Sequence, residues 1–153
     1  MHLDIKPGKL PLTIENILVS YSGKYKIGDL GLARLCIKHE DTDIQEGDSR
    51  YLAKELLNDF QTVEQIPDLR KADIFSLGAM MFELMSGKEL ETNGDEWHEL
   101  RNGNPNLQIL KDRGYSEETC YWLKRMLHPN VAERPECAEL LRDFLLSPIE
   151  KEL

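Results

Sequence analysis

Hydrophobic and polar positions divide the chain into a short β-forming part and a longer helical part. Residues 17–20 (ILVS) and the following stretch YSGKYKIGDLG predict two short strands around a Ser22-Gly23 turn. From residue 32 to about residue 50 the chain is polar and has no amphipathic period, which predicts a long loop.

Apolar residues recur at helical spacing in four later segments, which predicts helices over residues 72–87, 94–103, 116–127 and 134–146. The first segment is apolar around most of its circumference, which is typical of a helix in the middle of a domain. Its most apolar stretch, residues 74–85, contains Glu83 and is too short to span a bilayer. Ser116 is the expected N-cap of the third helix. The pattern predicts a mainly α-helical fold with a short β-ribbon.

Composition and charge narrow the partners that we expect for this chain. Its 153 residues are 41% hydrophobic, which suits one globular unit with a core. The net charge of −9 argues against binding to nucleic acid or to an anionic membrane, since both need clustered Lys and Arg. Three cysteines give no disulfide framework, and Cys36 with His39 lacks a second ligand pair, so no metal centre is expected there. We expect a monomer.

Two motifs near the start of the chain carry residues suited to phosphoryl transfer. This reaction needs a carboxylate for the acceptor hydroxyl, a second carboxylate on magnesium and a positive charge near the moving phosphate. Asp4 and Lys6, in the stretch HLDIKP, can supply the first and the third of these groups. Asp29, in the stretch GDLG, can supply the second. Each motif alone is a weak signal, because either one also occurs in ordinary solvated turns.

The order of five motifs resembles the C-terminal lobe of the eukaryotic protein kinases. HLDIKP and GDLG are followed by YLAKEL with Glu55, KADIFSLG with Asp73 and HPNVAERP with Arg134. The resemblance implies a partial kinase domain over residues 1–153, from the catalytic loop to the last helix of that lobe, with the N-terminal lobe absent. It also implies that Glu55 pairs with a buried Arg134 and that Asp73 holds the backbone of the catalytic loop.

The same resemblance implies ATP and magnesium as cofactors and assigns roles to four residues. Asp4 would be the catalytic base, and Lys6 a charge stabiliser that also contacts the nucleotide. Asn16 and Asp29 would hold the metal and, through it, the nucleotide. Without the lobe that covers the nucleotide, we expect the 153-residue chain alone to be inactive.

Asn16 departs from the kinase pattern, in which the Asn follows the catalytic Asp at the fifth position. It comes seven residues late, and deleting residues 9–15 would restore the stretch HLDIKPGNILVS. We expect this insertion to distort the site. A bulged loop could nevertheless return Asn16 to the metal, because the ends of a short loop close at modest entropic cost.

A narrower resemblance is to the Wee family of cell-cycle kinases. It rests on Leu3 before Asp4 in HLDIKP, on EGDSRYLAKELL without the usual Pro, and on NGDEWHELRNG around Trp97. It implies a nuclear kinase, with the cytoplasm as a second location, that phosphorylates an inhibitory tyrosine of a cyclin-dependent kinase and so delays mitosis. Leu3 stands where other kinases carry an Arg that binds an activation-loop phosphate, so control by such a phosphate is not expected.

Two alternatives stay open at this point. Membrane-associated Myt-type relatives share HLD-x-KP and EGD-x-RY, although the stretch around Trp97 favours the Wee side. A non-catalytic, kinase-like module could instead bind kinase partners through the Trp97 helix or the loop around Asp48. Lys6 is typical of serine/threonine-type catalytic loops, so the expected tyrosine specificity depends on the family resemblance alone.

Overall fold

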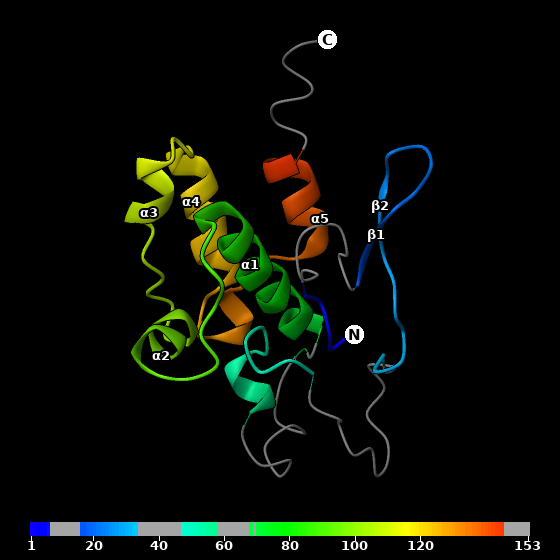
Figure 1. The fold of residues 1–153 in the computed structure, drawn as a ribbon, viewed down its shortest axis with the longest axis horizontal. Helices are drawn as coiled ribbons and strands as arrows, with labels where there is room; N and C mark the ends of the chain where they lie inside the picture. The colour runs from blue at the N-terminus through cyan, green and yellow to red at the C-terminus, as the bar shows by residue number, and fades with distance from the viewer. Residues whose placement is uncertain (7–15, 34–46, 58–67, 69, 146–153) are drawn as a thin grey trace.

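The computed structural model describes residues 1–6, 16–33, 47–57, 68 and 70–145, which form a small hairpin followed by a helical body (Figure 1). The strands are β1 (Ile17–Val19) and β2 (Tyr25–Ile27). The helices are α1 (Arg70–Ser86), α2 (Asp95–Arg101), α3 (Gln108–Asp112), α4 (Glu117–Met126) and α5 (Cys137–Glu139). Shorter turns are the 3₁₀ turns η1 (Lys54–Leu56) and η3 (Val131–Glu133) and the π-helical turn η4 (Leu140–Leu145), which continues α5. The mainly α-helical fold class is confirmed.

Helix α1 occupies the middle of the helical body, with α3 and α4 on one side and α5 on the other (Figure 1). Phe75 and Ala79 are completely buried in this helix, as expected for a helix that is apolar around most of its circumference. Gly78 lets α4 approach closely, because a Cβ at this position would lie 2.9 Å from the Cβ of Met126. The helix ends at Ser86, and the next residue is Gly87, whose φ of +62° favours glycine.

The hairpin confirms the predicted ribbon. Its strands are antiparallel, with Ile17 opposite Ile27, and Ser20 and Lys24 close the turn by a 2.8 Å backbone hydrogen bond. The hairpin projects from the helical body, and Val19 and Ile27 each expose more than half of their surface (Figure 1). The described contacts between the hairpin and the start of the chain are at the base of the hairpin, where Asn16 bonds to Asp4 and Gly28 bonds to His2. Asn16 and Gly28 are themselves linked by a backbone hydrogen bond.

One helix prediction needs correction, and one helix was missed. The helix predicted over residues 134–146 begins only at Cys137 and changes to π-helical pairing at Leu140. Helix α3 was not predicted, because its five residues are too few to show a period. The expected cap of α4 is confirmed, since the Ser116 hydroxyl accepts a 3.1 Å hydrogen bond from the Thr119 amide.

Predictions about the loop after residue 33 fall mostly on residues 34–46, outside the described part of the chain, and so do Cys36 and His39. In the described part, no three His, Cys, Asp or Glu side chains gather as a group that could hold a metal. None of the helices described combines the length and the apolar character needed to cross a membrane.

The ion pair between Glu55 and Arg134 joins η1 to the start of the last helical segment. The Arg134 side chain is completely buried and donates to Glu55 Oε1 at 2.5 Å and to Oε2 at 3.0 Å. It also donates to the backbone carbonyls of Lys71 and His128, at 2.9 and 2.8 Å. The predicted pair is confirmed, and its carbonyl partners satisfy a charge that would otherwise be costly to bury.

We expect Glu55→Gln to lower the free energy of unfolding by about 3–5 kcal/mol, because it leaves the buried Arg134 charge without its carboxylate. Urea unfolding followed by circular dichroism measures this change. Glu133→Gln, at an exposed carboxylate on η3, is the matched control and should unfold like the parent chain. If Glu55→Gln also unfolds like the parent chain, the pair contributes nothing to stability.

Candidate active site

The backbone of the predicted catalytic loop is attached to the first turn of α1. The Asp73 carboxylate accepts hydrogen bonds from the backbone amides of His2, at 2.6 Å, and of Leu3, at 2.8 Å. Leu3 has a φ of +69° and is 2% exposed. Such a left-handed conformation costs a non-glycine residue on the order of 1–3 kcal/mol. It is held by the two bonds to Asp73 and by burial of the Leu3 side chain, which confirms the scaffold role predicted for Asp73.

His2 links this loop to the end of strand β2. Its Nδ1 accepts from the Asp4 amide at 3.3 Å, so its Nε2 carries the proton and donates to the Gly28 carbonyl at 2.8 Å. The Nε2–H tautomer thus satisfies both contacts of His2, a residue that is 8% exposed. The two predicted motifs, HLDIKP and GDLG, are therefore held beside each other by one imidazole.

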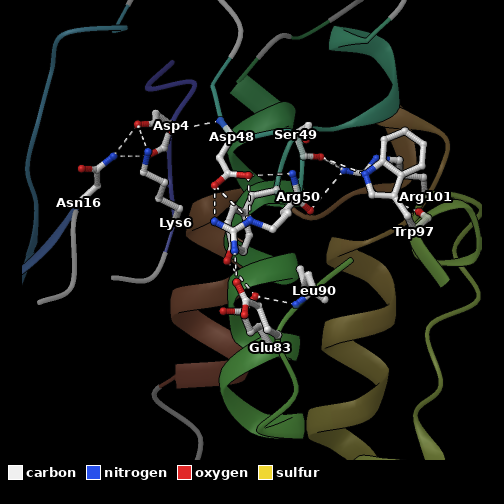
Figure 2. A network of polar contacts seen from close by, with 12 residues as sticks. Asp4, Lys6, Asn16, Asp48, Ser49, Arg50, Glu83, Leu90, Trp97 and Arg101 are labelled. Carbon is white, nitrogen blue, oxygen red and sulfur yellow. Dashed lines mark hydrogen bonds and ion pairs between the residues drawn. The ribbon is translucent and has the colours of Figure 1, made fainter. Parts of the chain in front are cut away.

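The structure brings Asp4, Lys6 and Asn16 together (Figure 2). The Lys6 ammonium lies 3.1 Å from Asp4 Oδ2. The Asn16 amide nitrogen donates to the Asp4 carbonyl at 2.6 Å and to its carboxylate at 2.8 Å. Asn16 is 2% exposed, so this contact is part of the folded core. Of the two outcomes that the sequence left open, Asn16 therefore returns to Asp4, while residues 9–15 themselves lie outside the described part of the chain.

Asp29 makes its side-chain contact within its own turn and not with this group. Its side chain is exposed, and its Oδ1 accepts from the Gly31 amide at 3.1 Å within the same turn. The φ of +53° at Asp29 turns the chain sharply after β2. In the described residues its carboxylate makes no hydrogen bond with Asp4 or Asn16. The oxygen of the Asn16 amide is turned away from Asp4 (Figure 2), and it is one of the hard oxygen donors that magnesium prefers.

A second segment, residues 47–51, lies against Asp4, and the sequence did not reveal this contact. A Cβ on Gly47 would lie 2.6 Å from the Leu3 carbonyl oxygen and 3.0 Å from Asp4 Oδ1. The Asp48 amide points at the same Oδ1, at 3.5 Å (Figure 2). Only glycine lets this backbone come so close, which is the physical meaning of the Gly in EGDSRY.

Asp48 and Arg50 form a bidentate pair at the centre of this segment. Arg50 donates to the Asp48 carboxylate through Nε, at 3.0 Å, and through Nη2, at 2.6 Å. Burial raises the pKa of Asp48, but the hydrogen bonds and charge of Arg50, with a smaller effect of Lys6, outweigh it and lower the pKa overall. The pair therefore stays ionised and folds the turn on itself.

Side chains of helix α2 bind the backbone carbonyls of the same segment. Trp97 Nε1 donates to the Ser49 carbonyl at 3.2 Å, and Arg101 donates to the carbonyls of Ser49 and Arg50 (Figure 2). The Arg101 guanidinium also lies 3.7 Å from the centre of the Trp97 ring. Arg101 is 2% exposed and has no carboxylate partner among the described residues. Burial lowers the pKa of Arg101 to about 10.

Helix α1 provides the last attachment of the segment. The Tyr51 hydroxyl donates to Glu83 at 2.8 Å, the Leu90 amide donates to the same carboxylate oxygen at 3.0 Å, and Ser76 donates to the Tyr51 carbonyl at 2.9 Å. Burial, and then the hydrogen bond to Glu83, raise the pKa of Tyr51. In the sequence Glu83 stood out only as a charged residue within an apolar helix. That pattern was the one sign that Glu83 binds other parts of the chain.

Comparisons with known proteins agree with this geometry. A family model described as the protein kinase domain matches residues 1–145. The chain is 38% identical over 164 residues to Wee1-like protein kinase 2 of Ailuropoda melanoleuca, covering 97% of this chain and 27% of that protein. It is 36% identical over 150 residues to a Wee1-like protein kinase of Oryza sativa subsp. japonica, covering 98% of this chain and 25% of that protein.

A Wee1-like protein kinase of Drosophila melanogaster is 37% identical over 126 residues, covering 82% of this chain and 19% of that protein. The chain thus spans about a quarter or less of the length of these relatives. The motifs that fold around Asp4 lie inside the matched region. Since the kinase domain matches nearly the whole chain, and the relatives span animals and a plant, this chain belongs to the protein kinase family, as a Wee-type member.

Proposed function

We propose that the chain belongs to a kinase that transfers the γ-phosphate of ATP to an inhibitory tyrosine of a cyclin-dependent kinase and so delays mitosis. The observation that supports phosphoryl transfer is that Asp4, Lys6 and Asn16 contact one another. Asp73 holds the backbone of the loop that carries Asp4. The tyrosine acceptor, the cyclin-dependent kinase substrate and a nuclear location come from the Wee-family resemblance. We further propose that the protein acts as a monomer.

In this proposal the Asp4 carboxylate orients the acceptor hydroxyl and takes its proton, as a general base within hydrogen-bonding distance of the reacting group. Lys6 places a positive charge next to that carboxylate, where negative charge develops on the transferred phosphoryl group. Asn16 fixes the Asp4 side chain through its amide nitrogen. The loop that carries Asp4 is itself held by the hydrogen bonds of Asp73 with the His2 and Leu3 amides.

The residues present fit a magnesium ion and its nucleotide in chemical type. The amide oxygen of Asn16 is turned away from Asp4, and the exposed Asp29 carboxylate has one oxygen engaged by Gly31, so both have oxygen donors to offer. When bound, magnesium would neutralise the charge on the ATP phosphates. Asn16 and Asp29 are the residues that we propose to hold it.

We propose that activity does not depend on phosphorylation of the segment opposite Asp4. Leu3 is buried and apolar, so it cannot bind a phosphate in the way that Arg does. The turn at residues 47–51 is held by unmodified groups, namely the Asp48–Arg50 pair and the contacts of Trp97 and Arg101. This arrangement supports a segment that is ordered without a charge-adding modification.

A non-catalytic interaction module is the second candidate. It is favoured by one observation: the Trp97 helix contacts the loop around Asp48, so that the two form one preformed face. The sequence had indicated each of them separately as a possible binding surface. A kinase assay separates the two candidates, since a module has no phosphoryl transfer to lose.

We expect the 153-residue chain by itself to transfer no measurable phosphate to a cyclin-dependent kinase. These residues include no Gly-x-Gly-x-x-Gly stretch to cover the ATP phosphates. Incorporation of radiolabelled phosphate, compared between the chain and its Asp4→Asn variant, measures this. Transfer that disappears with Asp4→Asn would show that the chain suffices for catalysis.

The proposed activity is tested in a chimera that joins this chain to the N-terminal lobe of a Wee-type relative. We expect tyrosine phosphorylation of a cyclin-dependent kinase, and a loss of roughly 10²–10⁴-fold with Asp4→Asn, because a positioned general base is removed. Deleting residues 9–15 should change the rate only a few-fold, since Asn16 already donates to Asp4. A large gain on deletion would mean that the extra residues distort the site, and an inactive chimera whose deleted form is also inactive would favour the interaction module.

Gly47→Ala should reduce the activity of the same chimera by about a hundredfold, because the added Cβ displaces the turn from Leu3 and Asp4 and a shift of ~1 Å is enough for such a loss. Ser49→Ala is the matched control in the same turn, since only the Ser49 carbonyl is used. Thermal unfolding of both variants checks that the domain stays folded. Equal activity of the two variants would show that the close approach at Gly47 has no part in catalysis.

A further inference from the structure

A cavity of about 230 Å³ lies between α2 and the end of α1, and Glu89 and Trp97 in its lining also contact residues 47–51. It is enclosed by the end of α1, the segment 88–91, α2 and the start of α3. Its apolar lining comes from Phe82, Leu90, Leu100, Pro105 and Ile109. The volume is below the range of about 300–1,000 Å³ that is usual for small-molecule and cofactor sites, and it suits one large apolar side chain of a partner.

Carboxylates surround this apolar lining, and only some of them are neutralised within the chain. Arg50 pairs with Glu89 at 2.5 Å, and Lys88 pairs with Glu96 at 2.5 Å. Three further carboxylates line the cavity, are exposed and have no ion pair in the described residues: Glu91, Asp95 and Glu99. Asp95 is accounted for by its place in the first turn of α2, where the helix dipole favours an acid. Glu91 interacts with the charge of Lys88, but Lys88 is already paired with Glu96, and Glu99 has no ion pair in the described residues. Glu91 and Glu99 therefore leave the cavity lining with an excess of negative charge.

We propose that this cavity is a docking site for a segment of a partner protein in which a large apolar side chain is flanked by Lys or Arg. The apolar lining would take the central side chain, and the flanking cations would meet Glu91 and Glu99. Charge complementarity selects this occupant, since nucleic acid and anionic lipid would be repelled by the same carboxylates. The proposal goes beyond phosphoryl transfer and does not depend on it.

The cavity is physically connected to the candidate active site. Trp97 lines it, and the indole nitrogen of Trp97 donates to the Ser49 carbonyl in the turn beside Asp4. A partner segment that packs against Trp97 therefore contacts the residue that helps to hold this turn. Docking here would also raise the local concentration of the partner near Asp4.

The two tryptophans of the chain provide a test with a built-in control. Trp97 lines the cavity, whereas Trp122 is buried in a separate cluster with Ile74, Met126 and Leu140. We would titrate the ¹⁵N-labelled 153-residue chain with a synthetic peptide that has one Phe between two Arg residues, and follow both indole resonances by NMR. Binding in the cavity should shift the Trp97 indole resonance and leave that of Trp122 in place.

Two control peptides separate the apolar and charge contributions, one with Ala in place of Phe and one with Glu in place of both Arg. Both should bind more weakly than the parent peptide. The proposal is wrong if the Trp97 resonance does not move, or if the Glu-flanked peptide binds as well as the Arg-flanked one. A shift that follows protein concentration without any peptide would identify a second copy of the chain as the occupant and would equally overturn it.

A matched pair of variants locates the charge effect. Glu91→Gln combined with Glu99→Gln should weaken peptide binding roughly threefold to tenfold, the scale of exposed ion pairs, and reduce its salt dependence. Glu118→Gln combined with Glu133→Gln removes the same number of exposed carboxylates outside the cavity and should bind like the parent chain. Equal affinity of the two double variants would refute the proposed site, and both can be checked for folding by their unchanged Trp122 resonance.

Discussion

The backbone of the predicted catalytic loop depends on one group, the carboxylate of Asp73. It holds two successive backbone amides, those of His2 and Leu3, and thereby stabilises the left-handed conformation of Leu3. Asp4 follows directly, so its direction is set by a residue in the first turn of a buried helix. The same turn of α1 is fixed by Arg134, which donates to the Lys71 carbonyl while it pairs with Glu55. The geometry of the candidate site is thus supported by the charged groups of Asp73, Glu55 and the buried Arg134, for which no part in the reaction is proposed.

Residues 47–51, which lie against Asp4, are held by one internal ion pair and by contacts with two helices, all between unmodified groups. Asp48 and Arg50 pair within it, Tyr51 reaches Glu83 on α1, and Arg101 on α2 holds its carbonyls. Arg101 is buried without a carboxylate, and its charge is met by carbonyl oxygens and the Trp97 ring. Leu3 offers no charge that could bind a phosphate, and residues 47–51 are held by these contacts between unmodified groups.

The position of Asn16 shows how tertiary contacts can absorb a change in spacing. The side-chain nitrogen of Asn16 donates to both the backbone carbonyl and the carboxylate of Asp4. The backbone carbonyl of Asn16 accepts a hydrogen bond from the Gly28 amide at the base of the hairpin. These contacts fix Asn16 from both sides. Counting residues from Asp4 therefore misjudges where Asn16 lies, because the hairpin that it begins is placed by its own hydrogen bonds.

The sequence by itself determined the helices with a clear period and the hairpin, because these depend on neighbouring residues and on the chemistry of a turn. It also determined the order of the kinase motifs, which is read directly from the chain. Through the family resemblance it also determined the partners of Asp73 and Arg134. Only the tertiary structure decided that Gly47 lies on Asp4, that Arg101 holds a turn some fifty residues earlier in the chain, and that an acidic cavity opens beside α2. Such contacts join residues far apart in the chain, and neither hydrophobic period nor motif spacing carries information about which distant surfaces meet.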